Sequence, residues 1–228
     1  MDIISLTKAY QDDYLRGTAR CKFVRRLRQQ QRAGEAEAVV HWALTQLKVQ
    51  VAVGENANGG PDFACCNSDG KRFTVEVTTI DDDAFRQRLR VPDPSFNRSY
   101  HVLLKGHLMK LRAVLKDKEQ QLRKAKVDMP SIVVIGCSDS SASAFLGAAD
   151  AVDAIGSFSE RCKDNRSPIS ALILLWWGWK SCRLIGCRNP KASEPLPSDW
   201  LPAIPLAQIT SESVSWPDDC FTECCLSF

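Results

Sequence analysis

The sequence predicts an α/β domain in which helices flank a mixed central sheet. Two apolar runs, at 131–137 and 169–177, have the length and composition of strands that are buried on both faces. Between such runs lie segments whose apolar residues recur every three or four positions, as in helices that pack one face on a sheet. Two shorter runs, at 63–66 and 72–80, flank an Asp-Gly pair and predict a hairpin. The 228 residues, 44% hydrophobic and 25% charged, suit one domain with a terminal extension.

The first part of the chain predicts helices followed by three strands. Residues 1–30 are expected to form a basic helical extension with few apolar positions, which packs late or contacts a partner. A helix over 34–48 is predicted by one apolar face, which consists of Ala36, Val39, Val40, Ala43, Leu44 and Leu47. Strands follow at 48–53, 63–66 and 72–80, and the Asp-Gly pair between the last two predicts a type I′ turn with positive φ angles.

The second part of the chain predicts two more helices and three strands. After a polar loop at 81–98, a long helix over 99–126 is predicted by a leucine stripe, which consists of Leu104, Leu108, Leu111, Leu115 and Leu122. The strand at 131–137, a small-residue helix at 142–155, the strand at 169–177 and a last edge strand at 182–187 complete a core that spans 31–188. Residues 189–228 contain cysteines and prolines and are expected to wrap the domain irregularly.

Composition excludes several classes of protein. No stretch of about 18 apolar residues is present, so the sequence predicts no membrane span. The first residues lack a basic start followed by an apolar stretch, so we expect no secretory signal, a cytoplasmic location and no membrane partner. The ten cysteines are spaced irregularly without paired CxxC sets, which favours small buried thiols over a disulfide framework or a zinc site.

Charge is segregated along the chain, although the net charge is only +3. Residues 14–34 carry seven Arg or Lys and no acid, and residues 84–126 carry twelve basic and three acidic residues. Residues 35–83 between them carry three basic and nine acidic residues. Basic surfaces attract phosphate backbones and clustered carboxylates bind divalent cations, so this pattern favours a nucleic-acid partner. The alternative is that long helices carry these charges on their solvent faces.

Two acidic residues occupy neighbouring places in the predicted hairpin. Asp62 stands at the head of the run at 63–66, and Glu76 lies inside the run at 72–80. Adjacent antiparallel strands bring such residues side by side, so their carboxylates could share a divalent cation. The structural alternative is that Asp62 caps the preceding turn and that Glu76 is an exposed strand residue.

Together with the preceding helix, this hairpin resembles the PD-(D/E)XK nuclease superfamily, which includes many restriction enzymes and archaeal Holliday junction resolvases. The resemblance covers about 31–137 and rests on GPDF at 60–63, on VEVT at 75–78 and on Glu37, which Leu44 follows seven residues later as in resolvase-like members. It implies a restriction-endonuclease-like αβββαβ core. It also implies that Mg²⁺ or Mn²⁺ is bound by Asp62, Glu76 and the backbone carbonyl of Val77, with Glu37 binding directly or through water.

The chain departs from the family at one position, because Thr78 stands where the motif has Lys. In the family that Lys positions the attacking water and stabilises the developing charge, and Thr carries no charge. Lys118 and Lys110 of the long predicted helix are candidate substitutes. On a helical wheel Lys118 falls inside the leucine stripe, so its ammonium either extends outward to solvent or is aimed at an acid.

Together these observations predict a metal-dependent endonuclease with DNA as the expected substrate. The expected catalytic residues are Glu37, Asp62, Glu76, Thr78, Lys118 and Lys110. The first alternative is a catalytically inactive nucleic-acid-binding or regulatory domain on the same fold. The second is a cysteine-rich interaction protein whose acidic centre is incidental. The sequence leaves open whether the chain acts as a monomer or as a homodimer.

Overall fold

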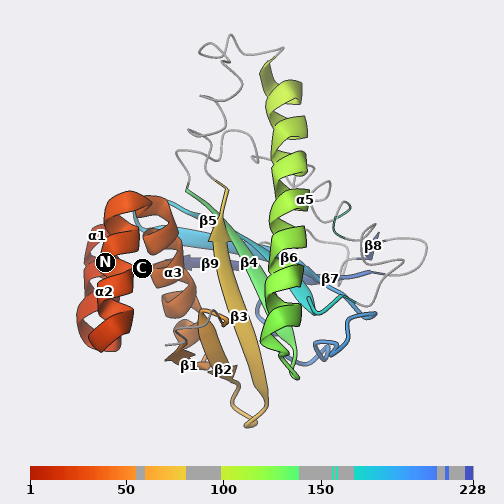
Figure 1. The fold of residues 1–228 in the computed structure, drawn as a ribbon, viewed down its shortest axis with the longest axis horizontal. Coiled ribbons are helices and arrows are strands. Elements are labelled where there is room, and N and C mark those ends of the chain that lie inside the picture. The colour runs from red at the N-terminus through yellow and green to blue at the C-terminus, as the bar shows by residue number, and fades with distance from the viewer. Residues whose placement is uncertain are drawn as a thin grey trace.

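The computed structural model describes residues 1–54, 60–80, 99–138, 156, 158, 167–209, 214–215 and 224–227. Across these residues the chain forms a mixed sheet of nine strands with helices on both of its faces (Figure 1). Neighbouring strands follow the order β1-β2-β3-β4-β5-β6-β7-β8, and β9 pairs with β6. The predicted α/β class with a mixed central sheet is confirmed.

Three α-helices and one π-helical turn precede the sheet: α1 (Ile3–Ala9), η1 (Tyr10–Tyr14), α2 (Gly17–Gln29) and α3 (Gln31–Gln46). Five side chains of residues 1–30 are buried in one cluster with α3: Ile3, Leu6, Tyr10, Leu15 and Phe23. Few apolar residues are enough to hold this segment on the core, because one buried aromatic side chain removes about 150–250 Å² from water. Residues 1–30 therefore belong to the core of the domain, contrary to the expected extension.

Three antiparallel strands form a meander after α3: β1 (Gln50–Val53), β2 (Phe63–Cys66) and β3 (Arg72–Thr79). The predicted hairpin between β2 and β3 is confirmed. The predicted type I′ turn is wrong, because Gly70 has a φ of 79° whereas Asp69 has no positive φ. Instead, the Asn67 side chain accepts hydrogen bonds of 3.0 Å from the backbone N–H groups of Asp69 and Lys71, which closes a longer loop.

The centre of the sheet is parallel and is buried on both faces. The long helix α5 (Ser99–Ala125) leads into β4 (Ser131–Ser138), which runs parallel to β3 and to β5 (Ala171–Trp177). Ile132 and Val134 of β4 share a core cluster with α3, whereas Val133 and Ile135 share a second cluster with α5. Successive side chains of a strand point to opposite faces, so α3 and α5 cover opposite faces of the sheet (Figure 1).

The C-terminal part of the chain adds short strands to the sheet, although residues 189–205 form neither helix nor strand, so the predicted irregular segment describes only part of 189–228. After β6 (Ser181–Arg188) come three short strands: β7 (Leu206–Ile209), β8 (Val214–Ser215) and β9 (Cys224–Ser227). Strand β6 pairs with β5, β7 and β9, so the prediction of an edge strand at 182–187 is wrong. Strands of two to four residues show no hydrophobic period, and the nearby prolines favoured a loop.

Two predicted segments, the polar loop at 81–98 and the helix at 142–155, lie outside the described residues. In the part of the chain that the structure describes, no helix is long and apolar enough to cross a lipid bilayer.

The cysteines whose side chains the structure describes form no disulfide bond: Cys21, Cys65, Cys66, Cys182, Cys187, Cys224 and Cys225. Cys65, Cys182 and Cys187 are buried, as expected of small apolar side chains, whereas Cys21 and Cys225 are exposed. Burial raises the pKa of Cys65 and of Cys182 to about 12, which keeps both thiols protonated and unreactive at neutral pH.

Candidate active site

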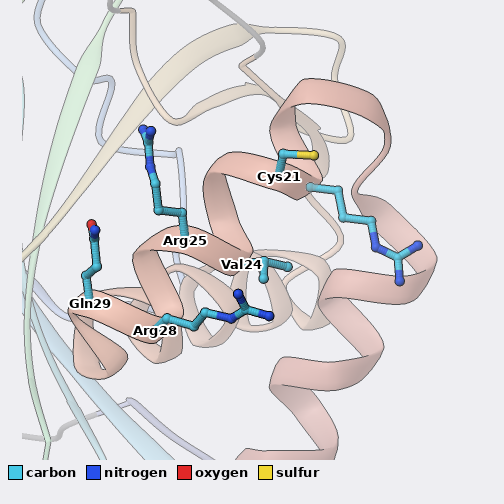
Figure 2. Close-up of a pocket in the computed structure, with 6 residues that line it drawn as sticks. Cys21, Val24, Arg25, Arg28 and Gln29 are labelled. Atoms are coloured by element: carbon cyan, nitrogen blue, oxygen red, sulfur yellow. The ribbon is translucent and has the colours of Figure 1, made fainter.

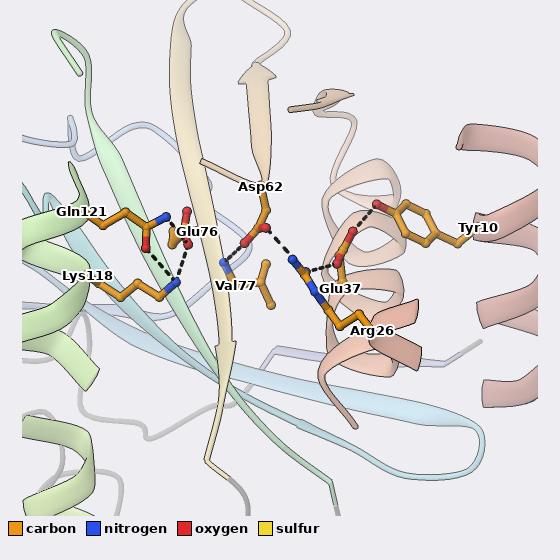
Figure 3. A network of polar contacts seen from close by, with 8 residues as sticks. All are labelled: Tyr10, Arg26, Glu37, Asp62, Glu76, Val77, Lys118 and Gln121. Atoms are coloured by element: carbon orange, nitrogen blue, oxygen red, sulfur yellow. Dashed lines mark hydrogen bonds and ion pairs between the residues drawn. The ribbon is translucent and has the colours of Figure 1, made fainter. Parts of the chain in front are cut away.

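The three acidic side chains that the sequence singled out lie on α3 and on the β2–β3 hairpin (Figure 3). Glu37 is on the buried side of α3, and only 6% of it is exposed. Its Oε1 accepts a hydrogen bond of 3.0 Å from the Tyr10 hydroxyl, and its Oε2 pairs with the Arg26 guanidinium. The N-terminal helical segments thus complete the surroundings of Glu37.

Asp62 lies directly before β2, at the point where the antiparallel pairing with β3 begins. Its Oδ2 accepts a hydrogen bond of 2.8 Å from the backbone N–H of Val77, and its Oδ1 lies 3.6 Å from Nη1 of Arg26. The carboxylate is therefore bound across the hairpin to β3. A simple cap on the preceding turn does not describe it.

The backbone of Val77 presents its carbonyl to the same place. On the β4 side of β3, the N–H of Thr74 donates to the carbonyl of Pro130. Backbone groups of successive strand residues point alternately to the two neighbouring strands. Val77 lies three positions after Thr74, so its N–H faces the β2 side, where it donates to Asp62. The N–H and C=O of one strand residue point to the same neighbouring strand, so the Val77 carbonyl also faces the β2 side near Asp62. The family resemblance implies this carbonyl as a metal ligand.

Glu76 is buried in β3 beneath α5, with 3% of it exposed. Its Oε1 accepts hydrogen bonds from Nζ of Lys118 and, at 3.0 Å, from Nε2 of Gln121. Its Oε2 is buried and has no hydrogen-bond partner among the described residues. The alternative of an exposed strand residue is wrong, because helices cover both faces of the sheet.

Arg26 belongs to this site, although the sequence did not single it out. Its Nη1 contacts Glu37 and lies 3.6 Å from Asp62, so one guanidinium bridges the two carboxylates (Figure 3). The sequence analysis missed Arg26 because it lies in a basic segment that was expected to be a separate extension. A signal was present, because Arg26 lies three residues after Phe23, the buried residue of α2, and residues three apart share a helix face.

The sequence left open whether the Lys118 ammonium extends to solvent or is aimed at an acid. The ammonium is aimed at an acid, since it contacts Glu76 and lies 3.2 Å from Oε1 of Gln121. Thr78 lies two residues after Glu76 on the same face of β3 and is half-buried. Lys110 is also half-buried, and it lies eight residues before Lys118, which is about 12 Å along the helix axis. Lys118 is therefore a cation that α5 places at Glu76.

The acids of the site repel one another and are shielded from water. Burial raises the pKa of Glu37 to about 7, although the Arg26 guanidinium opposes the change. Burial and the Asp62 carboxylate also raise the pKa of Glu76, and the Lys118 ammonium opposes them. Burial acts to lower the pKa of Arg26, but the Glu37 and Asp62 carboxylates outweigh it and raise that pKa. The site therefore favours any cation that can approach its oxygens.

Two side-chain cations lie where one shared metal ion was expected. Among the described residues, no three His, Cys, Asp or Glu side chains converge closely enough to hold a metal ion. Arg26 lies between Glu37 and Asp62, and Lys118 lies against Glu76 (Figure 3). The arrangement differs from the expected single cation-sized space, because the basic helices α2 and α5 each extend one cation to the acids.

Comparisons with known proteins provide no named counterpart for this site. No protein-family model, curated protein or solved structure matches the chain. The functional interpretation therefore depends on the residues and contacts described above.

Proposed function

We propose that the chain is a metal-dependent nuclease that hydrolyses phosphodiester bonds of DNA, with Mg²⁺ or Mn²⁺ as its metal. The observation that carries this proposal is a group of oxygen donors where the pairing of β2 with β3 begins. Asp62 is held there by the Val77 N–H, and the Val77 carbonyl faces the same side. Glu76 keeps one buried oxygen that has no partner among the described residues.

The chemistry of these donors fits a divalent cation. Carboxylate and carbonyl oxygens are the ligands that Mg²⁺ and Mn²⁺ prefer. A buried polar atom without a partner costs about 1–3 kcal/mol, which a cation bound at Glu76 would recover. The three acids do not converge in the metal-free arrangement, so their side chains would have to shift toward Asp62 before they could share an ion. Asp62, Glu76 and the Val77 carbonyl would then bind it, with Glu37 binding directly or through water, and the ion would lower the pKa of a bound water and offset charge on the phosphate.

Arg26 has to release Glu37 and Asp62 before their oxygens can bind a metal. Its side chain is 40% exposed, so water can solvate the guanidinium when it swings away from the acids. A released guanidinium stays charged and can donate two parallel hydrogen bonds to a phosphate. Arg26 would then contact the substrate beside the carboxylates that it had neutralised.

Lys118 supplies the positive charge that Thr78 lacks. Its ammonium is oriented by Glu76 and Gln121 before any substrate arrives. Such preorganised charge acts on the negative charge that develops at the phosphate in the transition state. In this proposal the Thr78 hydroxyl hydrogen-bonds the attacking water, and Lys110 contacts the substrate farther along α5.

Cleavage of plasmid and oligonucleotide DNA with Mg²⁺, Mn²⁺ or EDTA tests the proposal. We expect cleavage with either metal, none in EDTA, and a loss of about 100-fold or more in Lys118→Ala. Asp69→Asn removes a carboxylate from the exposed hairpin loop and should cleave as the wild type does. Absence of metal-dependent cleavage by the wild type on duplex, junction and single-stranded substrates would contradict the proposal.

A catalytically inactive nucleic-acid-binding or regulatory domain is the second candidate function. It is favoured by Arg26 and Lys118, which already neutralise the acids in the absence of metal. Under this alternative the wild type binds DNA in a salt-dependent manner without cleaving it, and Mg²⁺ leaves Tm unchanged. Both candidates assume a cytoplasmic protein, and sedimentation with and without DNA tests whether it acts as a homodimer.

A further inference from the structure

Helix α2 carries concentrated positive charge on the outside of the domain. Between Gly17 and Gln29 it holds five basic residues and no acidic residue. Arg26 turns inward to the site carboxylates, whereas the other four basic side chains are exposed: Arg20, Lys22, Arg25 and Arg28. One helix thus presents cations both to the acidic site and to solvent.

The exposed side of α2 is hollowed (Figure 2). A cavity of about 510 Å³, here called the α2 hollow, is lined by Arg20, Cys21, Val24, Arg25, Arg28 and Gln29. Arg20 is partly neutralised by Asp12 at 2.8 Å, so Arg25 and Arg28 provide most of the positive charge. Val24 and Cys21 add apolar surface between the cations. A hollow of this kind suits a ligand that alternates anionic and less polar groups.

The dimensions of the α2 hollow fit an extended polyanion better than a single phosphate. Arg20 and Arg28 lie eight residues apart, which is about 12 Å along the helix axis. A strand of duplex DNA carries one phosphate per roughly 3.4 Å of its axis, so it passes three or four phosphates over that length. Guanidinium groups bind phosphates through parallel N–H donors, and apolar side chains between them can contact the sugars.

The α2 hollow is connected to the acidic site through the helix itself. Arg26 follows Arg25 in the chain and bridges Glu37 and Asp62. We propose that the α2 hollow binds the phosphodiester backbone of DNA and leads it to the site carboxylates. That the bound DNA is guided to the site carboxylates rests on the proposed nuclease function, whereas the binding of DNA in the α2 hollow does not.

Titration of a labelled duplex oligonucleotide in EDTA, at several salt concentrations, tests the binding. The double variant Arg25→Gln with Arg28→Gln changes two exposed side chains, so we expect its circular dichroism and Tm to match the wild type. Its affinity should fall about ten-fold or more, and the slope of log K against log salt should weaken by about 2. The control variant Lys124→Gln with Lys180→Gln removes the same charge elsewhere and should lose less than about two-fold.

Three results would overturn the inference. These are unchanged DNA binding in the α2 variant, equal weakening in the control variant, or tighter binding of the wild type to anionic lipid vesicles than to DNA. Cleavage assays on the same proteins separate the two proposals. If the wild type cleaves DNA and the α2 variant binds it equally well, the inference fails and the nuclease function stands. If binding depends on the α2 hollow and the wild type does not cleave, the inference stands and the nuclease function fails.

Discussion

The carboxylates of Glu37, Asp62 and Glu76 are neutralised by Arg26 and Lys118 from two different helices. A charge that is buried without a partner costs several kcal/mol, so each acid needs either a nearby cation or a proton. A side-chain cation meets that need in the metal-free protein, and a bound metal would meet it in the active one. Single substitutions can therefore separate the structural role of these residues from their proposed chemical role.

Lys118→Ala should lower the free energy of unfolding by about 3 kcal/mol, because it leaves Glu76 buried without its cation. Urea denaturation at pH 7.5 measures the loss. Lys116→Ala, an exposed neighbour on the same helix, should change stability by less than about 0.5 kcal/mol. The double variant Glu76→Gln with Lys118→Met should recover much of the stability but no cleavage. Equal stability of Lys118→Ala and the wild type would contradict this role for the pair.

Arg26→Gln should destabilise the metal-free protein by about 1–3 kcal/mol, because Glu37 and Asp62 lose their shared cation. Millimolar Mg²⁺ should then raise the Tm of the variant more than that of the wild type, since no internal cation competes for the oxygens. Thermal unfolding with Mg²⁺ and with EDTA measures both effects. Arg25→Gln is the matched control and should respond to Mg²⁺ as the wild type does. An identical Mg²⁺ response in Arg26→Gln would show that Arg26 does not compete with metal.

At the scale of elements, the N-terminal helical segments close one side of the site. Tyr10 of η1 and Arg26 of α2 both reach Glu37 on α3, and Phe23 anchors α2 in the same core cluster. The rings of Tyr10 and Phe23 meet edge to face at 5.1 Å, which ties η1 to α2. A basic segment that could have been an arm is thus held as part of the domain, and its helix α2 keeps a fixed position relative to the acids.

Phe23→Ala should lower the free energy of unfolding by about 3–5 kcal/mol, as expected when a fully buried aromatic side chain is truncated. Val24→Ala, at the adjacent half-buried position, should cost about 1 kcal/mol or less. Chemical denaturation of both variants makes the comparison. If Phe23→Ala were as stable as Val24→Ala, α2 would be a peripheral arm rather than a core element.

At the scale of the whole molecule, one histidine buried between the helices and the sheet makes the stability of the fold depend on pH. His41 of α3 is 4% exposed and lies against the rings of Tyr10, Tyr14 and Phe63. Burial lowers its pKa from 6.5 to about 4. The unfolded chain therefore binds a proton between pH 6.5 and 4 that the folded chain does not bind, and stability falls as the pH falls through that window.

His41→Leu should remove this part of the pH dependence. Between pH 6.5 and pH 4, the wild type should lose roughly 2–3 kcal/mol more stability than the variant. Urea midpoints measured from pH 4 to 8 provide the comparison, and the shared background from other groups cancels in the difference. Parallel curves for the two proteins would mean that His41 is readily protonated in the folded state.

The sequence alone indicated the elements that repeat a local pattern over enough residues. The apolar face of α3, the β2–β3 hairpin, the leucine stripe of α5 and the buried strands β4 and β5 were all predicted. The hairpin pattern singled out Asp62 and Glu76, the family resemblance added Glu37, and the leucine stripe placed Lys118 with an acid as one of two possible targets. Such features are set by neighbours within a few positions, which is the range over which side-chain periodicity carries information.

Tertiary structure alone decided which cations neutralise these acids and where the sheet ends. Arg26 reaches Asp62, and Lys118 reaches Glu76, across separations in the chain that no periodic pattern records. Strands β7 and β9 are too short to be recognised locally and exist because β6 offers them unpaired backbone groups. Contacts of this kind depend on how whole elements pack, so they become visible only once the chain is folded.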